Sequence, residues 1–206
     1  MKKLQFLVAV AAIFVTCTAT ANSSMNGVYG KVQGSVYDLT THETTVTNNG
    51  ASGSIGNVGS VGFLFGGYGR MVRDWYMAVQ LQNDLNNFDR KFLSTAYTTQ
   101  LRAQSILGAS SLLGYQVIKD MVAYVAAGVD YARWQYSDST VGSNTSDRLG
   151  FAPRFGIRTM ISKNIFLNAE YKHTFFRTIT ISGGGSTFNA RPRVQTFTVG
   201  LAIKTS

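Results

Sequence analysis

The sequence is poor in cysteine, proline and charged residues, and each shortage narrows the class of protein. A single cysteine, Cys17, cannot form an internal disulfide. Two prolines exclude a collagen-like or proline-rich chain. Charged residues make up 14%, well below the usual share of about a quarter. The 45% of hydrophobic residues excludes intrinsic disorder, and 206 residues favour one domain.

Positive charge exceeds negative charge, with 19 basic and 10 acidic residues. A nucleic-acid-binding surface would require the basic residues to cluster, and most of them are scattered singly. We therefore expect no nucleic-acid partner.

The first 21 residues have the features of an export signal. Lys2 and Lys3 precede an uninterrupted apolar run over residues 6–15, and Ala19-Thr20-Ala21 fits a small-x-small cleavage site. The run is too short for a spanning helix, which needs about 20 apolar residues. We predict a signal peptide over residues 1–21, cleaved after Ala21, and a mature domain over residues 22–206.

A lipoprotein acylated at Cys17 is the alternative, although Phe14-Val15-Thr16 matches a lipoprotein box poorly. No later apolar run is long enough for a spanning helix. The exported chain is therefore either soluble or a membrane β-barrel.

Short polar turns recur at nearly equal intervals, at Arg73-Asp74, Lys119-Asp120 and Lys163-Asn164. Between them lie longer segments rich in Thr, Ser, Asn and Gly, which suit solvated loops: residues 38–59, 83–97, 137–148 and 177–192. This asymmetry is typical of outer-membrane barrels, which have short periplasmic turns and longer extracellular loops. We predict an all-β fold, an eight-stranded antiparallel up-and-down transmembrane β-barrel.

Apolar residues alternate with small or polar residues in most of the expected strands, which is the period of a β-strand. Trp75, Met77 and Val79, for example, alternate with Tyr76, Ala78 and Gln80. A polar network inside the barrel is expected from the second face: Lys31, Arg102, Asp130, Arg154, Arg158, Glu170 and Lys172. Such a face favours the polar interior of a membrane barrel over a lipocalin-like soluble barrel or a soluble sandwich.

The hairpin around Lys163-Asn164 brings acid and base together. An odd-length turn keeps inward residues opposite inward residues, and a turn over residues 163–165 sets Arg158 directly opposite Glu170. We predict an ion pair between them.

Glycine–aromatic motifs carry a resemblance to a known family. They are Gly27-Val28-Tyr29-Gly30, Gly66-Gly67-Tyr68-Gly69, residues 123–128 and Ala169-Glu170-Tyr171. On these motifs the mature chain resembles the small eight-stranded outer-membrane β-barrels, the group with OmpX-like, opacity-type and OmpA-type barrels. The resemblance implies a bacterial outer-membrane location and an assembly signal at Thr198, Gly200 and Ile203. It thus implies the barrel-assembly machinery as a partner, although Thr205 stands where an aromatic residue is usual.

Residues for catalysis or metal binding are scarce. His173-Thr174-Phe175 lacks the serine of the His-x-Ser arrangement found in barrels that deacylate lipid A, and Glu170 lies on the opposite face. Asp84 and Asp89 supply far fewer oxygens than the six to eight that calcium takes. We predict no enzyme, cofactor or metal.

Aromatic residues fall near the expected membrane rims. They are Trp75, Tyr131, Trp134, Phe175 and Phe176, with Tyr76 and Tyr136 expected inside. Arg177, Arg191 and Arg193 flank the last polar segment with no acid between them, and we expect contacts with lipopolysaccharide phosphates there.

The predicted function is a non-enzymatic integral outer-membrane protein. It would be monomeric, with a structural role in the envelope or an adhesin-like role toward a host surface ligand. A narrow channel or small-solute transporter is the alternative, and a lipid A-modifying enzyme is a weaker one.

Overall fold

A computed structural model describes residues 25–45, 52–84, 88–93, 98–138, 142–183 and 186–205. The predicted signal peptide, its cleavage site and the lipoprotein alternative at Cys17 lie outside these residues. Within them are eleven β-segments: β1 (Gly27–Thr45), β2 (Ser52–Val72), β3 (Trp75–Asp84), β4 (Phe88–Leu93), β5 (Thr98–Ile118), β6 (Met121–Asp138), β7 (Gly142–Phe151), β8 (Arg154–Ser162), β9 (Ile165–Phe176), β10 (Ile179–Gly183) and β11 (Ser186–Lys204). The described ranges contain no helix of the length and apolarity that crossing a membrane requires.

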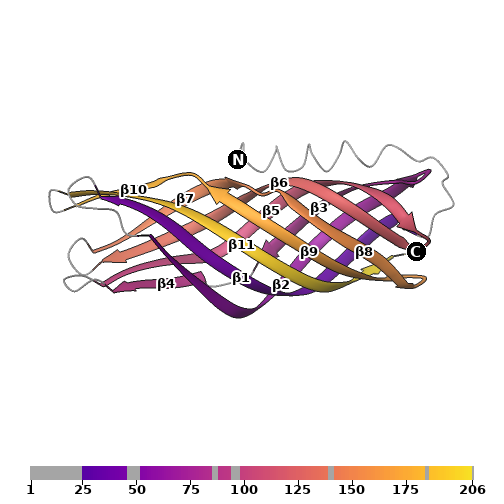
Figure 1. The fold of residues 1–206 in the computed structure, drawn as a ribbon, viewed down its shortest axis with the longest axis horizontal. Helices are drawn as coiled ribbons and strands as arrows, with labels where there is room; N and C mark the ends of the chain where they lie inside the picture. The colour runs from indigo at the N-terminus through magenta and orange to yellow at the C-terminus, as the bar shows by residue number, and fades with distance from the viewer. Residues whose placement is uncertain are drawn as a thin grey trace.

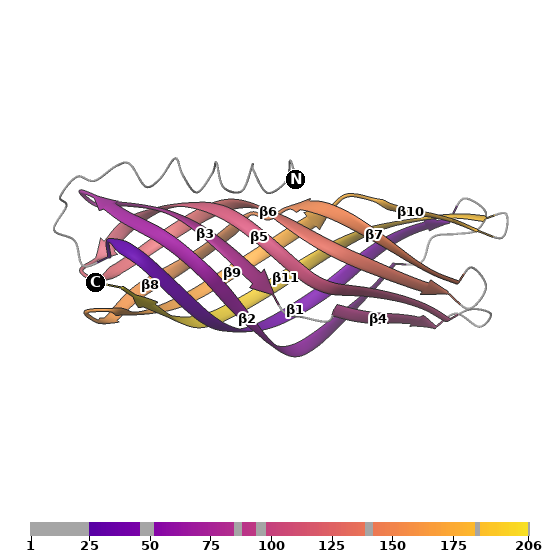
Figure 2. The ribbon, with the colours of Figure 1, turned by 180° about the vertical axis from the view of Figure 1, so that it is seen from behind.

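The segments form eight antiparallel strands that close into a barrel (Figures 1 and 2). β3 and β4, β7 and β8, and β9 and β10 are successive parts of single strands. The ring runs β1–β2–β3–β5–β6–β8–β9–β11, and β11 pairs with β1 to close it. Closure removes the unpaired edges that hydrocarbon does not tolerate. The predicted fold class is confirmed.

The three predicted short turns are confirmed at residues 73–74, 119–120 and 163–164. They lie at the same end as the C-terminus in Figure 1. The prediction of long loops at the other end is wrong for most of their length. β1 continues to Thr45, β2 begins at Ser52, and β7 and β10 occupy much of the later polar segments. Threonine-rich segments are good strand formers, and pairing satisfies the backbone groups that a loop would leave to water.

Alternation along the strands confirms which side chains face out near the short turns. Val125 and Ile203 are 61% and 62% exposed on the outer surface, whereas Tyr124 and Ala202 are buried inside. Close packing of aromatic rings explains why the inner face of β2 is rich in glycine. Gly67 and Gly69 lie against the rings of the buried Tyr29 and Tyr76, and a Cβ at either glycine would overlap a ring.

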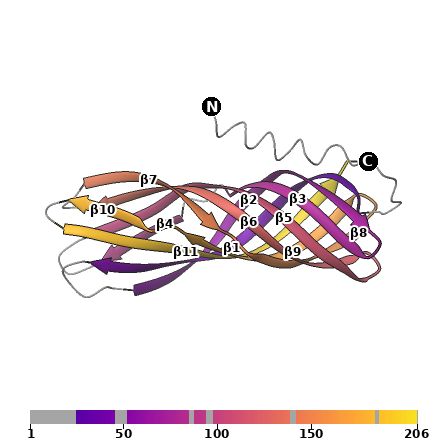
Figure 3. The ribbon, with the colours of Figure 1, turned by 90° about the horizontal axis from the view of Figure 1, so that it is seen from above.

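The barrel divides into two halves along its axis. We call the part from the short turns up to Val36, Val129 and Phe197 the barrel half, because its outer surface is apolar. The rest of the described chain, toward β4, β7 and β10, is the projecting half (Figure 3). β1, β2, β5 and β11 have 19 to 21 residues, against the roughly 9–11 that cross a bilayer. The projecting half therefore stands outside the hydrocarbon.

The projecting half is less completely closed than the barrel half. In the described chain, β4 pairs with β5 and β10 pairs with β11, each along one edge. β7 pairs with β6 along its whole length, whereas on its other edge it pairs with β9 at Gly150 and Phe151. Inside lies a hydrophobic core: Tyr37, Leu39, Ala103, Ile106, Ala132, Trp134, Tyr136, Phe176, Ile179 and Val194.

Candidate functional site

Asp130 on β6 is the centre of an ionic network inside the barrel half. Its carboxylate lies 3.1 Å from Arg154 Nη2 and 3.3 Å from Lys172 Nζ. The Thr174 hydroxyl donates a hydrogen bond of 2.8 Å to its second oxygen. Asp130 itself is fully buried, at 0% exposure. Two cations and a hydroxyl therefore replace the water that this carboxylate would otherwise bind.

Asp84 is a second acid of this network and was not among the predicted interior residues. Its Oδ2 lies 2.6 Å from Lys172 Nζ, and Gln33 donates a hydrogen bond of 3.3 Å to its Oδ1. The polar segment around Asp84 predicts a loop, where this acid was considered as a calcium ligand. The inward alternation of Gln80 and Gln82 was the signal that could have placed it inside.

Glu170 is buried inside as predicted, but its predicted pairing is wrong. Gly156 lies opposite Glu170, whereas Arg158 lies opposite Asn168. The turn has two residues, and an irregularity between Met160 and Ser162 shifts the register while keeping inward residues paired with inward residues. Glu170 instead lies 3.6 Å from Arg154 Nη1 and accepts a hydrogen bond of 2.9 Å from the Tyr124 hydroxyl.

Arg158 lies in an aromatic cage below the ionic network. Its Nε donates a 2.6 Å hydrogen bond to Asn168 Oδ1, and its Nη1 donates to the Tyr76 hydroxyl. The guanidinium carbon lies 4.4 Å from the ring centroid of Tyr29 and 5.9 Å from that of Phe166. Cation–π contacts of this kind stabilise a desolvated arginine that has no carboxylate beside it.

Two further predicted residues have different outcomes. Lys31 is buried in the barrel interior, as expected. The prediction for Arg102 is wrong: it pairs with Gln135 and is half-buried on the outer face. An irregularity in β5 between Ala103 and Ile106 reverses the alternation, so that Ala103 faces inward in its place.

The described interior holds four buried cations and three buried acids and offers little chemistry. The buried charged side chains of the described residues are Lys31, Asp84, Asp130, Arg154, Arg158, Glu170 and Lys172. Within the described ranges, acids, histidines and cysteines form no group of three that could hold a metal ion. His173 faces outward and stacks on Phe175 at 4.0 Å, on the opposite side of β9 from Glu170.

The three predicted rim arginines do come together. Arg177 lies between β9 and β10, and Arg191 and Arg193 lie on the neighbouring β11, all three exposed on the outer face. With Phe175, Phe176 and Thr178 they line one surface recess of about 440 Å³. Arg193 lies 5.8 Å from the ring centroid of Phe175.

Aromatic residues show that the rim prediction was partly wrong. Trp75 and Phe175 are exposed on the outer surface, and Tyr76 and Tyr136 are buried inside, as predicted. Trp134 and Phe176, expected at the membrane rim, are 1% and 3% exposed and pack edge to face at 5.2 Å inside the projecting half. The predicted membrane rim therefore lies too far along the strands, because Trp134 and Phe176 belong to the projecting half.

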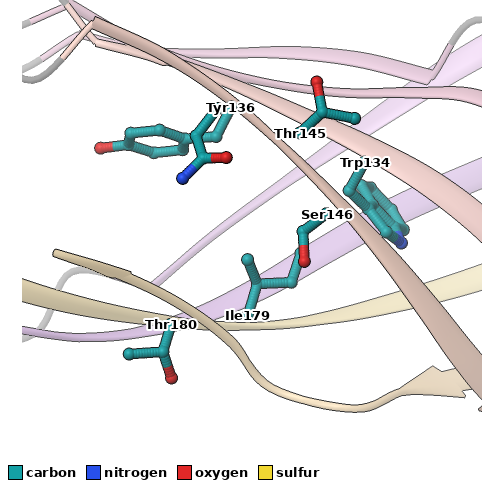
Figure 4. A pocket seen from close by; sticks show the side chains of 7 residues that line it. Trp134, Tyr136, Thr145, Ser146, Ile179 and Thr180 are labelled. Atoms are coloured by element: carbon teal, nitrogen blue, oxygen red, sulfur yellow. The ribbon is translucent and has the colours of Figure 1, made fainter.

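A small polar pocket opens beside Trp134, between β6 and β7 on one side and β10 on the other (Figure 4). Trp134 and Tyr136 of β6 lie across from Ile179 and Thr180 of β10. The pocket lies where β7 and β10 of the projecting half do not pair with each other.

The last strand carries the predicted assembly signal, which stays a prediction. Thr198 faces inward and its hydroxyl lies 3.2 Å from that of Ser35, whereas Ile203 faces outward. The backbone N–H of Thr205 donates a 2.9 Å hydrogen bond to the carbonyl of Val28, which holds the chain end against β1.

Comparisons with known proteins agree with this architecture. Residues 7–204 match a family described as the outer membrane protein beta-barrel domain. Similar solved structures include Neisserial surface protein A, with 16% identity, a TM-score of 0.48, and coverage of 87% of this chain and 97% of that one. OprG from Pseudomonas aeruginosa has 12% identity, a TM-score of 0.48, and coverage of 88% and 98%. Ail, the attachment invasion locus protein of Yersinia pestis, has 10% identity, a TM-score of 0.39, and coverage of 84% and 99%. No curated protein matches the chain in sequence.

Proposed function

The chain belongs to the outer membrane protein beta-barrel family, and from this premise we propose that it is a closed, non-enzymatic barrel whose function lies in its projecting half. It is a protein of the bacterial outer membrane. The observation that carries the proposal is the filled interior. Arg154 and Asp130 have side chains that are 0% exposed at the middle of the barrel, where a channel would need water.

The filling is continuous over two levels. The aromatic cage around Arg158 occupies the level near the short turns, with Tyr29, Tyr76 and Phe166 each at most 2% exposed. The ionic network of Asp84, Asp130 and Lys172 lies above it. Eight strands enclose only enough space for side chains, so these residues leave no room for a solute.

The projecting half is the surface offered to the exterior. It carries polar outer side chains over strands that continue beyond the membrane, and β7 and β10 each have an edge without a partner strand in the described chain. An adhesin-like or envelope-stabilising role through this half accounts for strands about twice the length that a bilayer needs.

Planar-bilayer recording of the purified protein tests the closed interior. We expect wild-type protein to show no discrete conductance. The double variant Tyr76→Ala and Phe166→Ala, which removes two cage rings, serves as a control that a widened barrel can be detected. The runner-up function, a narrow channel, is favoured by the inward cations Lys31 and Arg154. Ion-selective openings in wild-type protein would favour this channel and overturn the closed barrel.

Adhesion assays test the surface role. Bacteria expressing wild-type protein are compared with bacteria expressing a variant in which β10 and its connection to β11, residues 179–185, are replaced by a short glycine–serine linker. We expect reduced attachment to host cells with unchanged amounts of protein in the outer membrane. Equal attachment would contradict the adhesin-like role and leave the envelope-stabilising role. Deletion of the whole gene tests that second role, which predicts a loss of detergent resistance.

A further inference from the structure

We propose that Arg177, Arg191 and Arg193 form, with Phe175, a binding site for the lipid-borne phosphates of lipopolysaccharide. The site is on the outer wall over β9, β10 and β11, apart from the interior and from the free strand edges. Three features carry the inference: the convergence of the guanidinium groups, their lack of acidic partners, and their height above the apolar belt.

The three side chains lie together on neighbouring strands, beside a local irregularity in the sheet. Phe175 pairs with Arg193 across β9 and β11, but Ile179 pairs with Ala190 across β10 and β11, so one extra residue is accommodated at residues 177–178. Phe176 and Ile179 both face inward and are buried. Arg177 follows the outward Phe175 and the inward Phe176 in simple alternation, so it faces outward into the recess that Arg191 and Arg193 share.

The positive charge of this site is not neutralised within the described part of the chain. Its ion pairs there do not involve Arg177, Arg191 or Arg193. The outward acid on the neighbouring β7 is Asp147, which Arg133 already engages at 3.1 Å. On the other side, β1 contributes Asp38, half-buried opposite Gln195 rather than opposite an arginine.

The site stands just above the top of the apolar outer surface of the barrel half. Phe151 and Phe197 lie at that boundary, Leu149 and Phe175 continue the apolar surface up to the arginines, and all four are between 40% and 55% exposed. An arginine cluster directly above exposed aromatic and aliphatic side chains matches an amphipathic anion, with phosphate at the arginines and acyl chains along the belt below. A soluble polyanion would make use of the arginines alone.

Arginine suits this ligand because its planar fork donates two parallel hydrogen bonds to phosphate oxygens. A phosphate monoester carries up to two negative charges, so more than one guanidinium can be engaged at once. The ring of Phe175, 5.8 Å from the Arg193 guanidinium, holds that side chain beside the recess.

The test uses the full mature chain refolded in detergent, with thermal unfolding followed by circular dichroism as purified lipopolysaccharide is added. The variant is Arg177→Gln, Arg191→Gln and Arg193→Gln together. The control is Arg73→Gln, Lys119→Gln and Lys163→Gln, which removes three exposed positive charges at the short turns. The single variant Arg193→Gln is measured as well, so that a folding failure of the triple variant does not end the test.

We expect lipopolysaccharide to raise the unfolding temperature of wild type and control alike. The triple variant should require well over tenfold more lipopolysaccharide for the same rise, since it loses three arginines and a charged hydrogen bond of this kind is worth about a factor of ten. The single variant should lie between them. Enzymatically dephosphorylated lipopolysaccharide should stabilise wild type as weakly as intact lipopolysaccharide stabilises the triple variant.

Three results would overturn the proposal. An equal response of the triple variant and wild type would show that these arginines do not bind the lipid. An equal weakening in the short-turn control would show a dependence on net charge alone. An equal rise in unfolding temperature with inorganic phosphate or a soluble sulfated polysaccharide would assign the arginines to free anions rather than to lipid.

Discussion

The barrel half and the projecting half are built from the same strands with opposite polarity. On β6, Val125 and Val129 face outward in the barrel half, and Arg133 and Gln135 occupy the same face further up. Inside, Asp130 gives way to Trp134 within four residues. The alternation of the strand continues unbroken, while the outer face changes from apolar to polar and the buried charges inside end at Asp130. The surrounding medium, lipid below and water above, decides which face must be apolar.

The two interiors differ in the charge that they hold. The interior of the barrel half combines an apolar cluster near the short turns, which includes Leu112, Val122 and Phe166, with ion pairs and hydrogen bonds around Asp130 and Arg154. The projecting half is surrounded by water, and its interior is held by hydrophobic burial around Trp134 and Phe176. Substitutions that remove a buried charge should destabilise the barrel half most, and substitutions that remove buried volume should act on the core of the projecting half.

The largest effect is expected from Glu170→Gln in the barrel half. The change leaves the Arg154 guanidinium with less negative charge 3.6 Å away and breaks the charged hydrogen bond from Tyr124. Removing one partner of a buried pair costs about 3–5 kcal/mol, and here it leaves four buried cations facing two buried acids, Asp84 and Asp130, in the described interior. Urea unfolding in lipid vesicles measures the loss. An unfolding free energy equal to wild type would show that the interior charges are hydrated rather than paired.

The division into halves also explains how far sequence reasoning reached. Strand number, short turns and inward faces follow from period-two alternation, which extends over many residues and survives local irregularities. Arg102 and the facing of Arg158 were wrong because one irregular position in a strand changes the register. The two irregular positions are in β5 near Ala103 and in β8 near Ile161, and no residue type in the sequence marks either of them.

Asp84 and Trp134 illustrate a second limit. The polar segment 83–97 predicts a loop for Asp84, and the nearness of Trp134 to the polar segment 137–148 predicts a membrane rim. In the projecting half, polar residues form the outer face of paired strands, so Trp134 belongs to a core and not to a membrane rim. A polar composition indicates that a segment is exposed to water. It does not tell whether the segment is a loop or a strand that pairs with its neighbours.

The next effect in size is expected from Trp134→Ala, which tests the core of the projecting half. Truncating a buried tryptophan leaves a cavity and costs about 3 kcal/mol, the lower end of the usual range because the open edges at β7 and β10 allow relaxation. Proteolysis of intact cells should accelerate, while the detergent-resistant barrel half persists as a fragment. The lipid-facing Trp75→Ala, 49% exposed at the other end, should leave the rate unchanged. Simultaneous loss of both halves would mean that they unfold as one cooperative unit.

A matched pair of lysine substitutions on β6 locates the boundary between the halves. Val125→Lys places a charge on the lipid face and should cost roughly 2 kcal/mol. Gln135→Lys makes the same addition on the same face, ten residues further from the short turn, and should leave the unfolding midpoint within error of wild type. Urea unfolding in vesicles compares them. Equal costs at both positions would place the projecting half in the membrane.

The smallest effect is expected from Asp147→Asn, the counterpart of Glu170→Gln in the projecting half. Asp147 lies 3.1 Å from Arg133, a shorter separation than that between Glu170 and Arg154, yet both partners are about half exposed. The hydrogen bond that Arg133 donates to Asp147 raises the pKa of Arg133 above its ordinary value, so the arginine stays charged at every accessible pH. Water hydrates that charge once Asp147 is neutralised, so little stability is lost. We expect the same unfolding midpoint as wild type at low and high salt. A loss comparable to that of Glu170→Gln would mean that distance rather than burial sets the strength of these pairs.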